Sequence, residues 1–257
     1  MRDPGLSEAI RAAGGFRELA RRIGISQPSV SNWTRVPAER VVSVEAVTGV
    51  NRAVLRPDLY GYKKSLDADD VDVARAQEYA LLAALLTKAP NAALLSRISQ
   101  VRADPSPLGM AHAALADAAG TCTAEKIERE FFDLFIGLGR GELMPYGSYY
   151  LTGFLHERPL ARLREDLARI GIARADGVVE PEDQAGILCE IMSGLAGGRL
   201  PAPAASDQLI FEKHMAPWIR RFFADLENAE AADFYKHVGA LGRIFTDIEA
   251  EAFALPA

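Results

Sequence analysis

Apolar residues recur at helical spacing over most of the chain from Val73 onward, and no other feature restricts the fold as strongly. A spacing of three and four residues gathers apolar side chains on one face of an α-helix. We find no run of alternating β-branched residues and no strand–helix–strand pattern. The sequence therefore predicts an all-α protein. The faces behind this prediction are Tyr79, Leu82, Leu85 and Leu86; Ile127, Phe131, Leu134 and Phe135; Ile187, Ile191 and Leu195; and Phe234, Val238, Leu241, Phe245, Ile248 and Ala252.

Usual helix lengths and the residue types favoured at helix starts predict how many helices there are and where they begin. Usual helix lengths predict about eight to ten helices after residue 73. One of them is expected to start at Pro181, because proline suits the first helical position. Glu182 and Asp183 follow it, and acidic side chains favour the positive end of the helix dipole.

Charge divides the chain into two parts. Residues 1–64 hold eleven lysines and arginines against six acidic residues, whereas the remainder holds 18 against 29. A basic segment attached to an acidic body indicates a part that binds a polyanion. The SLDADDVD stretch between them is acidic and poor in core residues, as linkers are. We therefore predict a small basic domain over residues 1–64, an acidic linker over 65–73 and an all-helical domain over 74–257.

Several classes of protein lack their necessary parts here. The two cysteines, Cys122 and Cys189, are too few and too far apart for a disulfide scaffold or a zinc site. The four histidines have no metal-ligand spacing, and no nucleophile has an identifiable base. The N-terminus lacks an apolar signal core, and the longest apolar run, Tyr79–Thr87, is far shorter than the ~20 residues of a membrane span. We expect a cytoplasmic protein without catalytic residues, metal, cofactor or membrane association.

The segment FRELARRIGISQPSVSNW, from Phe16 to Trp33, predicts two short helices that cross tightly. Small residues are needed where such helices touch, and Ala20 and Gly24 are expected to fill those places. Ser26 is a good cap for the second helix, and a proline at position 28 is tolerated in its first turn. The pattern is that of a helix-turn-helix domain, whose second helix enters the DNA major groove. Its expected core is Leu19, Ile23, Ile25, Val30 and Trp33.

Residues 5–61 as a whole resemble the YdaS-like branch of the Cro/CI superfamily, which implies binding to duplex DNA. Phe16 departs from the family motif, where a glutamine is common at this position. A single head makes few contacts, so tight binding is expected to require a homodimer on paired half-sites. An alternative is a head that docks on a protein instead. The resemblance places Gln27, Pro28, Ser29, Ser31 and Asn32 toward the groove, and Arg21, Arg22, Arg35 and Arg40 toward the phosphates.

Three motifs recur in order in the C-terminal part. They are EREFFDLFIGLGRGELMPYGSYYL (128–151), EPEDQAGILCEIMSGL (180–195) and FEKHMAPWIRRFFADLENAEAADFYKHVGAL (211–241). Together they resemble the TorD/DmsD family over residues 74–253. That resemblance implies an all-helical bundle that escorts a molybdenum-containing oxidoreductase. The implied partner is the catalytic subunit of that enzyme or its twin-arginine leader peptide.

A twin-arginine leader offers two guanidinium groups followed by an apolar stretch, so its receptor needs carboxylates beside an apolar groove. Where the family motif usually reads Asp-His, this chain keeps the aspartate but has a glutamine next, which removes any titrating imidazole. The candidate client-binding residues are the acidic cluster Glu180, Glu182 and Asp183 with Gln184, and the group Phe135, Tyr146, Ser148 and Tyr149.

A second reading of the same residues is a one-component transcription regulator. In that case the helical domain senses a small ligand or dimerises. The two readings differ in the cavity that they need. A sensor needs an enclosed apolar pocket of roughly 300–1,000 Å³, whereas a leader-binding chaperone needs an open groove with an acidic rim near residues 180–184.

Overall fold

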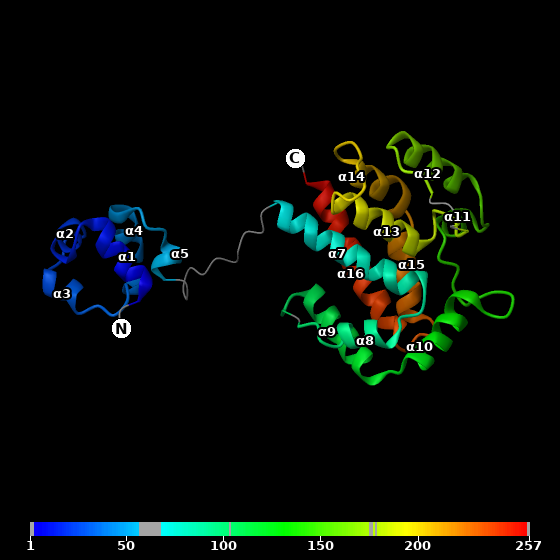
Figure 1. The fold of residues 1–257 in the computed structure, drawn as a ribbon, viewed down its shortest axis with the longest axis horizontal. Helices are drawn as coiled ribbons and strands as arrows, with labels where there is room; N and C mark the ends of the chain where they lie inside the picture. Colours follow the sequence, from blue (N-terminus) through cyan, green and yellow to red (C-terminus); the bar gives the residue numbers. More distant parts are fainter. Residues whose placement is uncertain (1–2, 57–67, 103, 175–176, 178, 256–257) are drawn as a thin grey trace. The chain divides into compact units, whose positions relative to one another are not determined.

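A computed structural model of the chain describes residues 3–56, 68–102, 104–174, 177 and 179–255. The chain divides into two compact units, Met1–Asp67 and Ala68–Ala257, which are described separately below as the head and the larger unit. Every regular element in the described residues is a helix, and the one β-type pairing among them is an isolated bridge (Figure 1). The predicted all-α fold is confirmed.

The head consists of short helices around a small apolar core. Leu19 and Val30 are fully buried in this core, as predicted, whereas Ile23, Ile25 and Trp33 are half-buried against it. Ser26 caps the second helix of the motif through the backbone N–H of Ser29. The helices are α1 (Pro4–Ala13), α2 (Phe16–Arg22), α3 (Gln27–Ser31), a 3₁₀ turn (Ala38–Arg40), α4 (Val41–Thr48) and α5 (Arg52–Leu55).

Gly24 has a different role from the one that its place in the motif predicts. It is exposed, its φ is +73°, and a Cβ added to it would meet nothing within 4 Å. Left-handed backbone of this kind suits glycine because a side chain would clash with the main chain. Gly24 therefore turns the chain between α2 and α3, and it does not fill a helix contact. Ala20 is buried, as expected for a contact position.

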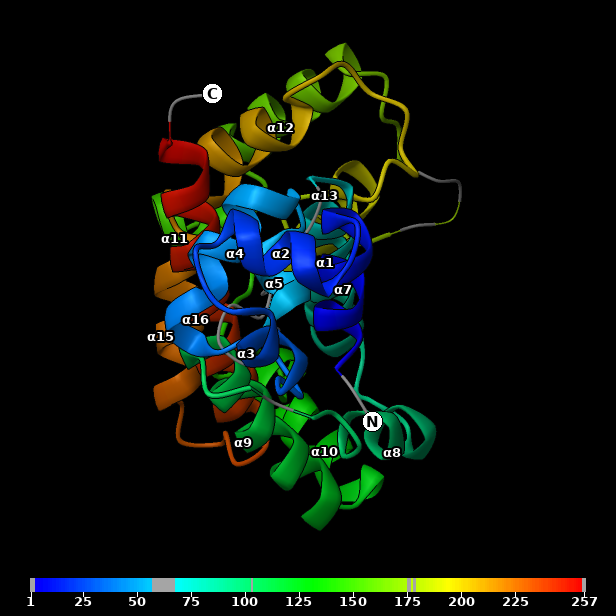
Figure 2. The same ribbon diagram turned by 90° about the vertical axis from the view of Figure 1, so that its left-hand side faces the viewer.

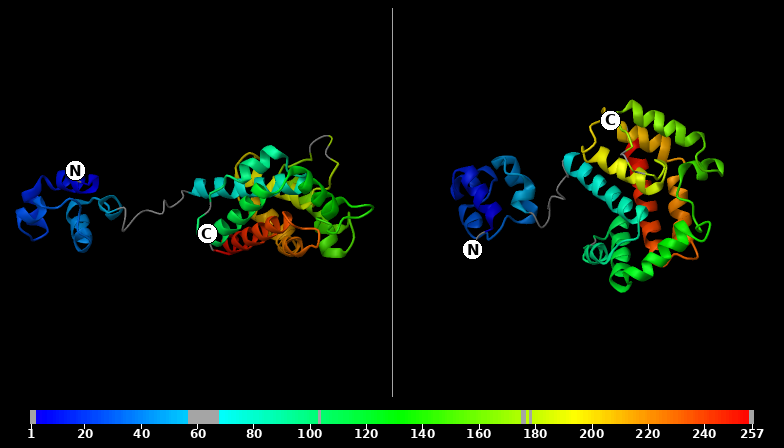
Figure 3. Two further views of the ribbon diagram at one scale, coloured as in Figure 1. Left: turned by 90° about the horizontal axis from the view of Figure 1, so that it is seen from below. Right: turned by 45° about the vertical axis from the view of Figure 1, so that its right-hand side comes forward.

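The larger unit is a bundle of ten α-helices in the part of the chain that the structure describes. Helix α7 packs along α13, as Figure 3 shows, and α16 contacts both α15 and α9; the red C-terminal turns of α16 are visible in Figure 2. The helices are α7 (Ala68–Thr87), α8 (Ala92–Ile98), α9 (Pro107–Thr121), α10 (Ala124–Phe131), α11 (Gly147–Thr152), α12 (Arg158–Arg169), α13 (Ala185–Ala196), α14 (Ser206–Ile210), α15 (Ile219–Asn228) and α16 (Tyr235–Ala254).

Two wide, π-helical turns interrupt this bundle, at Phe132–Ile136 after α10 and at Phe211–Met215 after α14. Such turns are rare in proteins, and those that occur often lie near functional sites. The core between the helices contains the predicted faces: Tyr79, Leu82, Leu85 and Leu86 are all at most 2% exposed. On the last predicted face, Phe234, Val238, Leu241 and Phe245 are buried, whereas Ile248 is 43% exposed.

A buried carboxylate starts the last helix. Glu130 accepts hydrogen bonds from the backbone N–H groups of Asp233, Phe234 and Tyr235, at 2.9, 3.1 and 2.6 Å. These donors have no partner within a helix, because the first turn lacks preceding carbonyl groups. Glu130 thus connects α10 to the start of α16.

Two boundaries differ from the sequence predictions. Residues 68–73, assigned to the acidic linker, form the first turns of α7, and residues 65–67 lie outside the described residues. The helix expected to start at Pro181 starts at Ala185, with Gln184 as its cap. The preceding residues are held in a turn by pairing with residues 145–147, as described next. The predicted domain boundaries at 64 and 74 stay a prediction.

Candidate functional site

Two of the three C-terminal motifs meet at a short antiparallel bridge between Tyr146 and Gln184. The backbone N–H of Gly147 donates to the carbonyl of Asp183 at 2.9 Å, and the N–H of Ala185 donates to the carbonyl of Pro145 at 2.8 Å. The bridge therefore fixes the loop before α11 against the loop before α13. It brings together six of the eight predicted client-binding residues.

Asp183 and Ser148 lie beneath this bridge. The Asp183 carboxylate accepts a hydrogen bond from the backbone N–H of Ser148 through Oδ2 at 2.7 Å, so it caps the start of α11. Asp183 is 3% exposed and Ser148 is fully buried. The second carboxylate oxygen, Oδ1, and the Ser148 hydroxyl have no hydrogen-bond partner among the described residues. A buried acceptor without a partner is costly, so Asp183 Oδ1 is a candidate for ligand contact.

Gln184 is fully used by the fold. Its Oε1 accepts from the backbone N–H of Ile187 at 2.9 Å, and its Nε2 donates to the carbonyl of Leu86 at 2.9 Å. The side chain therefore caps α13 and connects it to the end of α7. This explains how an amide can occupy the position where the family motif usually has histidine.

The two glutamates of the acidic cluster are placed differently. Glu182 is 8% exposed and pairs with Arg164 at 2.8 Å and with Arg174 at 3.8 Å. Glu180 is exposed and accepts a hydrogen bond from the Tyr146 hydroxyl at 3.0 Å. Burial and the nearby Glu180 carboxylate raise the pKa of the Tyr146 hydroxyl, so it stays protonated and donates. Of these two glutamates, Glu180 has the accessible carboxylate.

A small cavity of about 140 Å³, here called the bridge pocket, lies beside the Tyr146–Gln184 bridge. Among its lining residues are four of the predicted client-binding residues, Phe135, Tyr146, Glu180 and Gln184. Tyr149 is not among them: its hydroxyl accepts from Arg140 at 2.7 Å, and the Arg140 guanidinium lies 5.4 Å from its ring centroid.

A larger cavity of about 440 Å³, here called the acid-rimmed pocket, shares Glu180 and Ile187 with the bridge pocket. Its lining includes the apolar side chains of Leu167, Ile172, Ile187, Ile191 and Leu200, and it is partly open to solvent. Three carboxylates, those of Glu180, Glu182 and Glu190, also line it, as do Arg174 and Arg199.

Sequence reasoning missed Glu190. It is exposed and forms no hydrogen bond or ion pair with any other residue that the structure describes. Its position three residues after Ile187 and directly before Ile191 was a usable signal, because residues three apart share a helix face.

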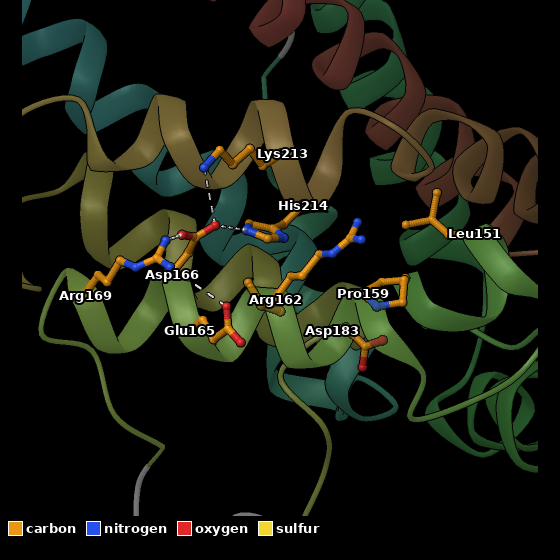
Figure 4. Close-up of a pocket in the computed structure, with 11 residues that line it drawn as sticks. Leu151, Pro159, Arg162, Glu165, Asp166, Arg169, Asp183, Lys213 and His214 are labelled. Carbon is orange, nitrogen blue, oxygen red and sulfur yellow. Dashed lines mark hydrogen bonds and ion pairs between the residues drawn. The ribbon is translucent and has the colours of Figure 1, made fainter.

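A third cavity, of about 400 Å³, lies on the Asp183 side of the bridge and is here called the Asp166 pocket (Figure 4). Asp166 of α12 is 6% exposed and contacts three basic side chains. The Nε2 of His214 lies 2.9 Å from its Oδ2, Arg169 donates to its Oδ1 at 2.6 Å, and the Lys213 ammonium lies 3.6 Å away. The hydrogen bond with His214 lowers the pKa of Asp166 below its usual range. The sequence did not single out this pocket, although Gly147, Asp183 and His214 each belong to one of the three C-terminal motifs.

The candidate nucleic-acid interface of the head is formed mainly by α3. Gln27, Pro28, Ser29 and Asn32 are exposed, and Ser31 is half-buried. The Ser29 hydroxyl lies 2.8 Å from that of Ser26, so the cap uses part of its hydrogen-bonding capacity.

The four predicted phosphate-contacting arginines of the head are all exposed. Arg21 and Arg22 share one partner: Glu18 accepts from Arg21 Nε at 3.0 Å and from Arg22 Nε at 3.1 Å. These hydrogen bonds lower the pKa of Glu18 to about 2. Arg40 has no such partner among the described residues, and neither does Arg17, which sequence reasoning missed.

Two kinds of feature are absent from the described residues. No three side chains of the metal-ligating types lie close enough together to hold an ion. No described helix is both long enough and apolar enough to cross a membrane.

Comparison with known proteins gives matches for both units. Residues 102–224 match the family model of the nitrate reductase delta subunit, and residues 6–64 match that of the bacterial toxin YdaS. Chaperone protein TorD from Vibrio atlanticus is 22% identical over 139 residues, covering 50% of this chain and 65% of the relative. Chaperone protein TorD from Vibrio cholerae is 24% identical over 129 residues, covering 47% and 59%.

The matched region is thus less than two thirds of the length of either relative. Within it lie the first two C-terminal motifs and the bridge that joins them. The resemblance expected from the sequence is confirmed for both parts of the chain: the head is similar to the YdaS family, and the larger unit is similar to the TorD chaperones.

Proposed function

We propose that this chain is a maturation chaperone for a molybdenum-containing oxidoreductase and that its head binds DNA and gives it a regulatory role. Its partners are the catalytic subunit of that enzyme, or the twin-arginine leader of the subunit, and duplex DNA. The similarity to TorD chaperones supports the class of protein. The observation that supports this client is the acid-rimmed pocket, which combines the exposed carboxylates of Glu180 and Glu190 with an apolar lining.

The chemistry of a twin-arginine leader fits that pocket. A guanidinium group pairs with a carboxylate through two parallel hydrogen bonds, and an apolar stretch needs an apolar groove. Glu180 and Glu190 are exposed at the pocket, whereas Glu182 is already paired with two arginines. Ile187 and Ile191, on the same helix as Glu190, provide apolar surface beside it. We therefore assign Glu180 and Glu190 as the contacts to the arginine pair, and Asp183 and Gln184 as supports of the loop.

The test is a titration of the full chain with two leader peptides, one with the arginine pair and one with lysines in its place. Glu180→Gln and Glu190→Gln should each weaken binding of the arginine peptide by at least about tenfold, on the scale of one charge-assisted hydrogen bond. The lysine peptide should change little, because an ammonium cannot form the paired contact. Glu128→Gln, at an exposed position on α10 outside the pocket, is the matched control for net charge.

Equal weakening of both peptides would mean that the carboxylates only attract positive charge at long range. Unchanged binding of the arginine peptide in both variants would move the client site elsewhere in the larger unit. Either result contradicts the assignment of Glu180 and Glu190.

For the head, the exposed first turn of α3 supports direct contact with DNA. Gln27 and Asn32 have amides that pair with adenine edges in the major groove, and Arg35 and Arg40 are exposed after α3. Arg40→Gln in the full chain should weaken binding evenly across DNA sequences, whereas Asn32→Ala should reduce sequence preference. Affinity should fall with salt at a log–log slope of about −0.9 per phosphate contacted. Absence of any binding at about 50 mM salt would favour a head that docks on a protein.

The regulator reading requires a pocket that encloses a small ligand. The acid-rimmed pocket is partly open to solvent and has two exposed carboxylates, those of Glu180 and Glu190, which favours an extended peptide over an enclosed effector. A homodimer on paired half-sites remains part of the proposal for tight DNA binding.

A further inference from the structure

The Asp166 pocket is separate from the acid-rimmed pocket, and the two have no lining residue in common. Its sides come from α12, from the π-helical turn Phe211–Met215 that places Lys213 and His214, and from Gly147 and Asp183 at the bridge. Figure 4 shows Asp166 at the centre of a group of basic side chains. The formal charges of its lining balance, with three basic side chains against three carboxylates, whereas the acid-rimmed pocket has three carboxylates against two arginines.

One cation of the pocket, Arg162, has no ion-pair partner among the described residues. The Asp166 carboxylate is already matched by His214, Arg169 and Lys213. The side chain of Glu165 is 67% exposed and lies 3.9 Å from Arg169. Arg162 lines the pocket but forms no hydrogen bond or ion pair with any residue that the structure describes, and in Figure 4 its guanidinium extends from α12 toward the side where Leu151 lies. An occupant with a carboxylate would complete this arrangement.

A second feature defines the occupant further. The Oδ1 of Asp183, a residue only 3% exposed, lacks a hydrogen-bond donor, and Asp183 lines the same pocket. An occupant must therefore donate an N–H or O–H there as well as accept from Arg162. A simple anion meets only the second requirement, and a cation meets only the first. A peptide with an acidic side chain meets both, because its backbone supplies the N–H.

The edge of the pocket adds an apolar requirement. Leu151 lines the cavity and is 43% exposed, and Phe154 and Leu155 in the following loop are 69% and 37% exposed. Exposed apolar side chains beside a polar pocket are typical of surfaces that bind other polypeptides.

We propose that the Asp166 pocket binds an extended segment of a client polypeptide in which an acidic residue stands next to apolar ones. The acidic side chain pairs with Arg162, a backbone N–H of the segment donates to Asp183 Oδ1, and the apolar neighbours pack on Leu151. This rests on the proposed chaperone function for the nature of the occupant, but it concerns a different pocket from that of the leader.

The probe is a labelled peptide, Gly-Leu-Glu-Phe-Ala-Gly, compared with versions that carry Gln or Lys in place of Glu. The full chain should bind the Glu peptide at least about tenfold more tightly than the Gln peptide, as one charge-assisted contact implies. In Arg162→Gln this ratio should fall to within about twofold. Arg97→Gln, an exposed arginine on α8 with the same change in net charge, should keep the full ratio.

Arg162 is exposed, so its substitution leaves the fold intact. Asp183→Asn should weaken the Glu and Gln peptides by the same factor, because it removes an acceptor for the backbone N–H. Equal binding of the Glu and Gln peptides by the unchanged protein would overturn the proposal. A ratio that survives Arg162→Gln would also overturn it.

Competition separates this proposal from the proposed function. The twin-arginine leader should not displace the Glu peptide, and Arg162→Gln should leave leader binding unchanged. Displacement at equal occupancy would mean a single shared site and would overturn the second site. If the leader does not bind at all while the Glu peptide does, the assignment of Glu180 and Glu190 fails and the Asp166 pocket stands.

Discussion

In the head, charged side chains lie at the surface, whereas the larger unit buries several of them. Every buried polar or charged residue among the described residues belongs to the larger unit, and Glu130 and Glu249 are examples. A domain of about 60 residues has little interior in which a charge can be surrounded by partners. In the head, most residues of the predicted binding motif are therefore exposed to solvent. In the larger unit, several motif residues hold the fold together, and most of the proposed ligand contacts are exposed neighbours of these residues.

The largest expected effect tests the interior of the larger unit. Glu130→Ala removes the acceptor of three backbone N–H groups at the start of α16. We expect a loss of about 3–5 kcal/mol in the free energy of unfolding, because these donors would remain buried without partners. Glu128→Ala, at an exposed position on the same helix, should cost less than about 0.5 kcal/mol. Urea unfolding of both variants measures the difference, and similar losses would show that burial of Glu130 does not matter.

The second prediction separates structure from ligand contact within one motif. Asp183→Ala should lower the free energy of unfolding by about 1–3 kcal/mol, because it leaves the buried Ser148 N–H unpaired. Glu180→Ala should cost less than about 1 kcal/mol, because its carboxylate is exposed. Thermal unfolding is the measurement. If Glu180→Ala proves the more destabilising change, the division between supporting and contacting residues is wrong.

The third prediction uses pH on a buried pair of the larger unit. His112 on α9 lies 3.0 Å from Glu78 on α7, and this hydrogen bond, together with the Glu78 and Asp104 charges, raises the pKa of His112 above its ordinary value. A raised pKa means that the pair stabilises the fold fully below the ordinary histidine pKa of about 6.5. The contribution is lost as the pH rises through the pKa of the folded state.

Stability measured from about pH 6 to pH 8 should therefore decline more in the unchanged protein than in His112→Gln. The matched control is His237→Gln on α16. Burial is the chief reason that the pKa of His237 lies below its ordinary value. If the stability of His112→Gln declines by the same amount over this pH range, the His112–Glu78 pair is not the cause of the decline.

The smallest expected effect concerns the head. Glu18 accepts hydrogen bonds from Arg21 and Arg22 at the surface, so Glu18→Gln should release both guanidinium groups for phosphate contact. We expect DNA affinity to rise by about twofold to fivefold at low salt, and the gain to vanish in high salt, where exposed charges are screened. Glu8→Gln, an exposed acid on α1, gives the same change in net charge. An equal gain in that control would mean that only net charge matters.

The sequence predicted the parts of this molecule that depend on local patterns. The helical face from Tyr79 to Leu86 is buried, as its spacing predicts. Gln27 at the start of α3 and Asn32 directly after it are exposed, which also follows from local spacing. The start of α13 was not predictable in this way. Gln184 caps it only because the carbonyls of Leu86 and Pro145, distant in sequence, lie beside it.

The Asp166 pocket shows the same limit for a site. Asp166 and His214 are 48 positions apart and belong to no common motif, and the π-helical turn that places His214 leaves no mark in the apolar spacing. Gly24 shows the same limit of sequence-based prediction at a single residue. Its sequence position indicated a small residue, but the reason is its left-handed backbone, which the motif does not reveal.

The Tyr146–Gln184 bridge also limits how the length of this chain can vary. Within the four residues from Glu182 to Ala185, one side chain pairs with arginines, one caps α11, one caps α13, and the last backbone N–H bonds to Pro145. Inserting a single residue here would shift at least two of these contacts out of register, and no neighbouring side chain could replace both. Relatives of this protein should therefore tolerate changes of residue type in this stretch far better than any insertion or deletion.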